Sequence, residues 1–274
     1  MRIPEGIRQR AWRVWARARD RGFRSQLRHD PDGPVIVLSP HLDDAVIDCW
    51  SVLVDGDPTM VATVCAGIPR PGPPGHWDAL AGARDRAQRM RDRREEDRAA
   101  LALAGCPGVH LPFAQADHRP GPPPALARID RALCERVPAA RALYAPAGLG
   151  TLHPDHGLVR GYALRLAAQG MPVQLYADAP YAVIYGWPAW VTGAAPDPYL
   201  DIDLYWRAAG APLALTDRAR ARVVRLAPEQ SAAKLAAMRS YRSQFSVLDR
   251  GPTGVLSNPA VHGYEVFWAV PRAA

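Results

Sequence analysis

The sequence predicts an α/β fold, a Rossmann-like three-layer sandwich built on a mostly parallel sheet, with the active site at the C-terminal edge of the strands. Two observations lead to this prediction. Short apolar runs of strand length alternate with segments of helical periodicity, which is typical of βαβ units around a parallel sheet. Clusters of His and Asp follow directly on such runs, and α/β proteins bind their ligands just beyond the carboxyl ends of the strands.

Each strand is expected from an apolar, β-branched run, and each helix from apolar residues at a spacing of three and four. Expected strands cover residues 35–38, 60–65, 109–113, 142–145 and 173–176. Expected helices cover residues 45–53, 125–136 and 157–168, and a long charged helix or helix pair covers about 78–104. Beyond residue 185 the pattern weakens, and we expect two short strands at 200–204 and 213–215, a helix near 228–243 and an apolar tail ending at 265–268.

The composition predicts one domain over residues 31–274 and disfavours nucleic acid as a partner. Hydrophobic residues make up 48% of the 274 residues and charged residues 22%, which suits a chain that buries a substantial core. The net charge is +7, and residues 1–28 account for all of it with nine Arg against two acidic residues. Because a nucleic-acid enzyme concentrates basic side chains around its site, the balanced remainder of the chain argues against that class.

Residues 1–30 are expected to form a separate appendage, a basic amphipathic helix. Apolar residues recur there at helical spacing, with Arg on the other faces. We expect this helix to pack on the body; the alternative is peripheral contact of residues 1–28 with an anionic membrane surface or an acidic partner. Neither a signal peptide nor a membrane span is recognisable. The four cysteines lack CxxC spacing and indicate a reduced compartment, so the expected location is the cytoplasm, with the inner face of the membrane as an alternative.

Two motifs supply the candidate catalytic and metal-binding residues at the predicted C-terminal edge of the strands. Pro-His-Leu-Asp-Asp-Ala covers residues 40–45, and His-Pro-Asp-His covers residues 153–156. Within each motif two side chains lie three residues apart, which places them on one helix face. Two His and one Asp around an ion leave a coordination position for water, as in catalytic zinc sites. Asp43 would remain free to accept a proton, or its role would be only to cap the following helix.

Together the two motifs resemble those of the PIG-L/LmbE-like superfamily of zinc-dependent N-acetylglucosaminyl deacetylases, over about residues 34–160. The resemblance implies one Zn²⁺ ion, whose ligands would be His41, Asp44 and His156. It also implies three catalytic groups: Asp43 as the general base, His153 as the group that stabilises the oxyanion and later protonates the amine, and Asp155 as the residue that orients His153.

The resemblance further implies hydrolysis of the acetamide of an N-acetylated amino sugar, which releases acetate and a free amine. The substrate would be an N-acetylglucosaminyl-type conjugate, such as a glycosylated natural product or a lipid-linked sugar. The residues leave open whether His153 or Asp43 protonates the leaving amine. The alternatives are the same zinc machinery acting on a different amide conjugate, and a non-catalytic sugar-binding module.

Substrate-binding residues are predicted from weaker features. An Arg-rich acidic helix around 93–97 resembles one in the same superfamily and favours Arg93 over Arg94 as a substrate contact. Trp77, Tyr181 and Trp187 lie near predicted strand ends and are expected to form walls of a pocket. The residues expected to have only surface or packing roles are Asp48, His76, His110, His118 and His262.

Overall fold

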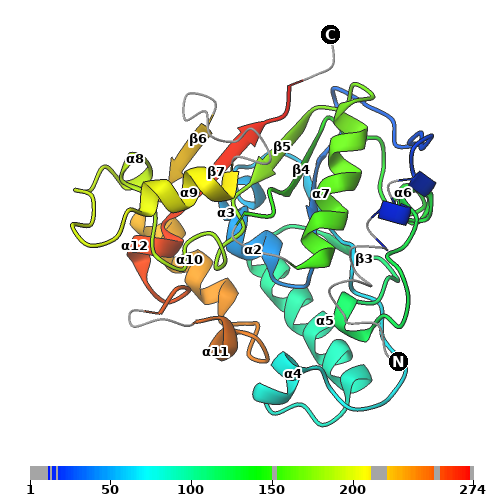
Figure 1. Cartoon of the computed structure of the whole chain (residues 1–274), viewed down its shortest axis with the longest axis horizontal. Helices are drawn as coiled ribbons and strands as arrows, with labels where there is room; N and C mark the ends of the chain where they lie inside the picture. The colour runs from blue at the N-terminus through cyan, green and yellow to red at the C-terminus, as the bar shows by residue number, and fades with distance from the viewer. Residues whose placement is uncertain are drawn as a thin grey trace.

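The computed structural model describes residues 12, 14–16, 18–149, 153–210, 221–249 and 254–271, without the side chain of Trp77. Within this part of the chain, seven strands form one sheet in the order β3-β2-β1-β4-β5-β7-β6 (Figure 1). The strands are β1 (Val35–Ser39), β2 (Thr59–Thr63), β3 (Gly108–His110), β4 (Ala142–Pro146), β5 (Val173–Tyr176), β6 (Ala221–Arg225) and β7 (Tyr264–Ala269). The first five are parallel, whereas β7 runs antiparallel to β5 and to β6. The predicted mostly parallel α/β sheet is confirmed.

The central strand β1 divides the interior into two apolar cores, which makes the fold a three-layer sandwich. Ile36 and Leu38 belong to the first core, and Val35 and Val37 to the second, because successive side chains of a strand point to opposite faces. The first core also receives α6 (Leu126–Cys134) and α7 (Pro154–Ala167). The second receives α2 (Asp44–Asp48), α3 (Trp50–Leu53), α5 (Arg86–Leu103) and α10 (Pro228–Met238), of which α2 and α5 both contact α10 (Figure 1).

The predicted long charged segment is a pair of helices, α4 (His76–Leu80) and α5. The chain turns between them at Gly82, whose φ of +77° is the left-handed conformation that glycine adopts readily. Asp85 then caps α5, because its side chain accepts a hydrogen bond from the Gln88 N–H. The remaining short elements are η1 (Ala116–His118), α8 (Ala189–Thr192), α11 (Phe245–Leu248) and α12 (Pro259–His262).

The strand predicted at 200–204 is wrong, because this segment begins the helix α9 (Ile202–Gly210). The carboxylate of Asp201 accepts a hydrogen bond from the Leu204 N–H at 2.8 Å and so begins the helix. Ile202, Tyr205 and Trp206 then follow at a spacing of three and four, a period that belongs to a helix. The strand predicted at 213–215 lies outside the described residues. The apolar tail forms β7, and β6 was not predicted.

The described part of the N-terminal segment contacts the body of the protein. Residues 14–16 and 18–19 are helical. The guanidinium of Arg19 donates hydrogen bonds to the carbonyls of Pro123 and Pro124, just before α6, and the Gln26 N–H donates to Asp130 within α6. Among the helices that the structure describes, none combines the length and the hydropathy needed to cross a lipid bilayer.

Candidate active site

Three neighbouring strands bring the polar clusters together at one edge of the sheet. His41 to Asp44 follow β1, His153 begins α7 shortly after β4, and Asp178 follows β5. The imidazole centroids of His41 and His153 lie 4.6 Å apart, and those of His41 and His156 lie 5.2 Å apart. The two motifs, which are distant in sequence, therefore share one site at the carboxyl ends of the strands, where α/β sheets bind ligands.

His41, Asp44 and His156 form a set of buried groups suited to a divalent metal ion, since their ligand atoms all lie within 4.8 Å of one another. The Nε2 atom of His156 is buried and has no hydrogen-bond partner among the described residues, and it lies 3.7 Å from Oδ1 of Asp44. A buried nitrogen without a partner is costly to the fold, so this atom needs a ligand such as a cation. Two imidazoles and one carboxylate are a common ligand set of catalytic zinc.

A second group of potential ligands, His41, His153 and Asp155, fits a cation less well. The Asp155 carboxylate accepts hydrogen bonds from the Ala116 N–H at 2.8 Å and from the Arg119 guanidinium at 3.1 Å, and it also contacts His41 Nε2 at 3.2 Å. Its oxygens are therefore already occupied, and the adjacent positive charge of Arg119 would repel a metal ion. The first group is the better metal site.

Asp43 lies beside this group with a different orientation. It occupies the N-cap position of α2, yet its side chain makes no capping hydrogen bond, so capping is not its role. Burial and the neighbouring charge of Asp44 raise the pKa of Asp43 to about 6. Nη2 of the buried Arg93 lies 3.8 Å from Oδ2 of Asp43. A buried carboxylate with a raised pKa next to a ligand set is suited to proton transfer.

The two histidines of the second motif have opposite electrostatic environments. Burial and the nearby His41 lower the pKa of His153 to about 3, and its Nδ1 accepts a hydrogen bond from the Asp155 N–H at 3.3 Å. Burial also disfavours a charge on His156, but the Asp44 and Asp178 carboxylates outweigh it and raise the pKa of His156 to about 9. The lowered pKa keeps the His153 ring neutral, and because its Nδ1 accepts a hydrogen bond, the ring carries its hydrogen on Nε2.

A cavity of about 550 Å³ opens onto these groups. Part of its lining is polar, and the residues that form it are Asp78, Arg93, Gln115, Asp117 and His118. Another part is apolar, and the residues that form it are Ile47, Pro180, Ile184, Val247, Leu248 and Val255. His41, Asp43, Asp44 and His153 also line this space. The volume is that of a site for a small molecule.

Comparison with known proteins gives matches only among solved structures, since no family model and no curated protein matches the sequence. A deacetylase triple mutant from the teicoplanin biosynthetic pathway is 26% identical with a TM-score of 0.63, over 88% of this chain and 98% of that one. The A40926 pseudoaglycone deacetylase Dbv21 is 26% identical with a TM-score of 0.61, over 89% of this chain and 100% of that one. The N,N'-diacetylchitobiose deacetylase of Pyrococcus horikoshii shares the fold at 17% identity and a TM-score of 0.53, over 98% and 94%.

In fold and in both motifs, the chain is similar to deacetylases of the PIG-L/LmbE-like superfamily. Its fold matches the structural neighbours over most of its length, and the superfamily motifs at residues 40–45 and 153–156 meet at one edge of the sheet. The resemblance noted in the sequence is therefore confirmed.

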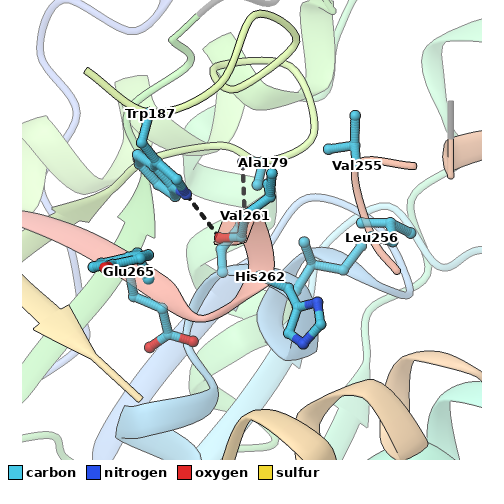
Figure 2. Close-up of a pocket in the computed structure, with 11 residues that line it drawn as sticks. Ala179, Trp187, Val255, Leu256, Val261, His262 and Glu265 are labelled. Atoms are coloured by element: carbon cyan, nitrogen blue, oxygen red, sulfur yellow. Dashed lines mark hydrogen bonds between the residues drawn. The ribbon is translucent and has the colours of Figure 1, made fainter. Parts of the chain in front are cut away.

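The predicted substrate-binding residues divide into two groups. Arg93 and Tyr181 line the large cavity, and the Tyr181 ring lies 5.5 Å from the His156 ring. Arg94 is directed elsewhere, since its Nε donates to Nδ1 of His110. Trp187 does not line this cavity: its indole N–H donates to the Val261 carbonyl at 2.7 Å beside a space of only about 10 Å³ (Figure 2). The side chain of Trp77 lies outside the described part of the molecule.

Several groups at the site were missed or misjudged in the sequence. Asp48 is buried rather than solvated, and its carboxylate accepts the Ala179 N–H at 2.9 Å. His118 lines the cavity, where its Nε2 lies 3.4 Å from Oδ2 of Asp78. Asp178 contacts His156 directly. Its position immediately after a predicted strand was the one feature that indicated a role for Asp178, whereas Asp78 and His118 have no comparable feature.

Proposed function

We propose that this protein is a metal-dependent N-deacetylase that hydrolyses the acetamide of an N-acetylated amino sugar and releases acetate and the free amine. The observation that carries the proposal is the convergence of His41, Asp44 and His156 next to the unbound carboxylate of Asp43, at one end of a large cavity. The deacetylases of the teicoplanin and A40926 pathways, similar over most of this chain, support the same reaction class.

We assign zinc as the ion, held by His41, Asp44 and His156. Once bound, it would polarise the acetyl carbonyl and lower the pKa of a water molecule. The ligand set of two imidazoles and one carboxylate favours zinc over the harder cations, which prefer oxygen ligands. Two hydrogen bonds orient this set: the Asp178 carboxylate accepts Nδ1–H of His156, and Oδ2 of Asp44 accepts the main-chain N–H of His41 at 2.8 Å.

The residues around the ligands divide the chemical steps between them. Asp43 takes a proton from the water molecule that attacks the acetyl carbon, and it returns this proton to the nitrogen as the C–N bond breaks. His153 stabilises the oxyanion, because its Nδ1 accepts the Asp155 N–H and its Nε2 therefore carries the hydrogen to donate. Arg93 lies close enough to Asp43 to orient this carboxylate and to contact the sugar.

The mixed lining of the cavity supports an amphipathic substrate. Sugar hydroxyl groups would contact the polar lining residues, of which Arg93, Gln115 and Asp117 supply donors and acceptors. An apolar aglycone or lipid would contact apolar lining residues such as Val247 and Leu248. We therefore propose an amino sugar linked to an apolar group, in preference to free N-acetylglucosamine.

The test is a panel of N-acetylglucosaminyl compounds offered to the zinc-loaded protein, with free amine and acetate measured together. The panel contains N-acetylglucosamine, its octyl glycoside, and an N-acetylated amino acid amide as a different class of amide. We expect release of acetate and amine in equal amounts, fastest with the octyl glycoside. Tight binding of the glycosides without acetate release would identify a sugar-binding module. Turnover of the amino acid amide alone would identify a different amidase.

A further inference from the structure

The carboxylate of Asp178 is fixed by three donors at the back of the site. It is fully buried, as is His156. Its Oδ1 accepts a hydrogen bond from Nδ1 of His156 at 2.6 Å. Its Oδ2 accepts the backbone N–H groups of Gly148 at 2.5 Å and of Leu149 at 3.0 Å. Both oxygens therefore act as acceptors, and the carboxylate joins the loop after β4 to the first turn of α7.

This arrangement determines which nitrogen of His156 is available to a ligand. Because Nδ1 carries the hydrogen donated to Asp178, the lone pair of the neutral ring lies on Nε2. Nε2 faces Asp44 at 3.7 Å and has no hydrogen-bond partner among the described residues. We propose that Asp178 is a positioning residue of the metal site: it orients the His156 ring and selects the tautomer that binds the ion through Nε2. This inference rests on the metal site of the proposed function.

The loop that carries Asp178 is itself anchored to the element that carries another ligand. The Ala179 N–H donates to Asp48 at the end of α2, and Asp44 is the first residue of the same helix. On the other side, the Ala177 N–H donates to the Val266 carbonyl of β7 at 2.9 Å. The distance between Asp178 and the ligand set is therefore fixed from both sides, which is what a carboxylate that supports a metal-bound imidazole requires.

The substitution Asp178→Asn separates this role from simple space filling. An amide has one oxygen, and the Gly148 and Leu149 N–H groups both need an oxygen to remain satisfied. The Asn nitrogen would then face His156 and donate to Nδ1, which moves the ring hydrogen to Nε2. A protonated Nε2 cannot bind a metal ion. Asn therefore keeps the shape of the side chain and reverses the tautomer.

The experiment measures zinc affinity by competition with a chromophoric chelator in the full-length protein. We expect Asp178→Asn to weaken zinc binding about 10- to 100-fold, the usual effect of losing such a partner. The matched control is Asp130→Asn. Asp130 is also buried and accepts the Gln26 N–H at 2.7 Å and the Tyr162 hydroxyl at 2.7 Å. It lies in α6, and its partners Ser25, Gln26 and Tyr162 include none of the three proposed ligands, so its substitution should leave zinc affinity unchanged.

Equal zinc affinity in Asp178→Asn and the wild type would overturn the inference while leaving the proposed function intact. An equal loss in Asp130→Asn would also overturn it, because the effect would then be general to buried aspartates. A wild-type protein that binds no zinc would overturn both the inference and the proposed function.

A second measurement needs no variant and so remains decisive where Asp178→Asn fails to fold. In zinc-loaded wild-type protein labelled with ¹⁵N-histidine, NMR should detect a hydrogen that stays on Nδ1 of His156 and a metal-bound Nε2. Metal binding through Nδ1 would contradict the assignment.

Discussion

Replacing Asp43 with Asn separates proton transfer from metal binding. Asn has the same shape, and Arg93 keeps other partners, since Gln115 lies 3.3 Å and Asp78 4.0 Å from its Nη1. The geometry around position 43 should therefore survive. Without a carboxylate to accept the proton, we expect kcat to fall by about 10²- to 10⁴-fold, while one zinc ion per chain remains bound to the three ligands.

The pKa of Asp43 gives the same variant a predicted effect on stability. The folded pKa of about 6 lies above the unfolded value of 3.8. The stability contributed by this carboxyl is therefore fully present below pH 3.8 and is lost as the pH rises through about 6. A shift of this size corresponds to at most about 3 kcal/mol. The metal-free Asp43→Asn protein should be at least as stable as the wild type at pH 7.5, and this advantage should disappear towards pH 4.

Three measurements on the purified variant check this reasoning: zinc content by atomic absorption, kcat by amine release, and the free energy of unfolding in urea at both pH values. The matched comparison is Asp44→Asn, which should lose zinc and activity together. If Asp43→Asn loses the metal and Asp44→Asn keeps it, the assigned roles of the two carboxylates are reversed. If Asp43→Asn retains full activity, Asp43 is not the base.

Three further predictions concern Arg93, the metal and the core. Arg93→Gln should lower kcat/KM about 10- to 100-fold, since a buried charged hydrogen bond contributes about 1.5–3 kcal/mol. The control is Arg94→Gln, which should leave kcat/KM unchanged because the Arg94 side chain bonds His110 instead. A chelator should abolish activity and zinc should restore it, and zinc at a hundredfold excess over its Kd should stabilise the fold by about 2.7 kcal/mol in thermal unfolding. Lys234→Met should lower the free energy of unfolding in urea by about 3–5 kcal/mol, because it leaves the buried Glu265 carboxylate without the ammonium group 2.8 Å away. A loss below about 1 kcal/mol would show that the buried Lys234–Glu265 ion pair does not stabilise the fold in this way.

The parallel half of the fold was predictable because its central strands, such as β1 and β2, are mostly buried apolar runs. Val35 to Leu38 are all buried. Polar and apolar residues therefore do not alternate in this run, and a continuous apolar run is typical of a central parallel strand. The sequence indicates the strands of the antiparallel edge, β6 and β7, less clearly. In β6 no residue is fully buried, and the exposed Arg222 and Arg225 interrupt the apolar residues, so neither an apolar run nor a regular alternation indicates a strand. The segment at 200–204 was misassigned because Leu200, Ile202 and Leu204 alternate with aspartates, which is the period of a half-buried strand.

The site was predictable where two potential ligands share a short motif, and it was not where a single residue acts. His41 and Asp44 indicate a metal by their spacing, whereas Asp178 acquires its role only when β5 lies beside β4. The same holds for His118, whose partner Asp78 is supplied by a separate helix. A histidine or an aspartate without a nearby companion in sequence gives no indication of which distant group it will face.

The last strand described, β7, is translated after all three candidate metal ligands, His41, Asp44 and His156. Glu265 of this strand accepts hydrogen bonds from the main chain at Trp50, 215 residues earlier, and at Ser51, and Val266 holds the loop that carries Asp178. When His41, Asp44 and His156 have been translated, every proposed ligand is present, but the strand that holds the neighbouring segments in register is not. A transcript with an early stop codon before Tyr264 should yield a polypeptide that carries both motifs and has no working site.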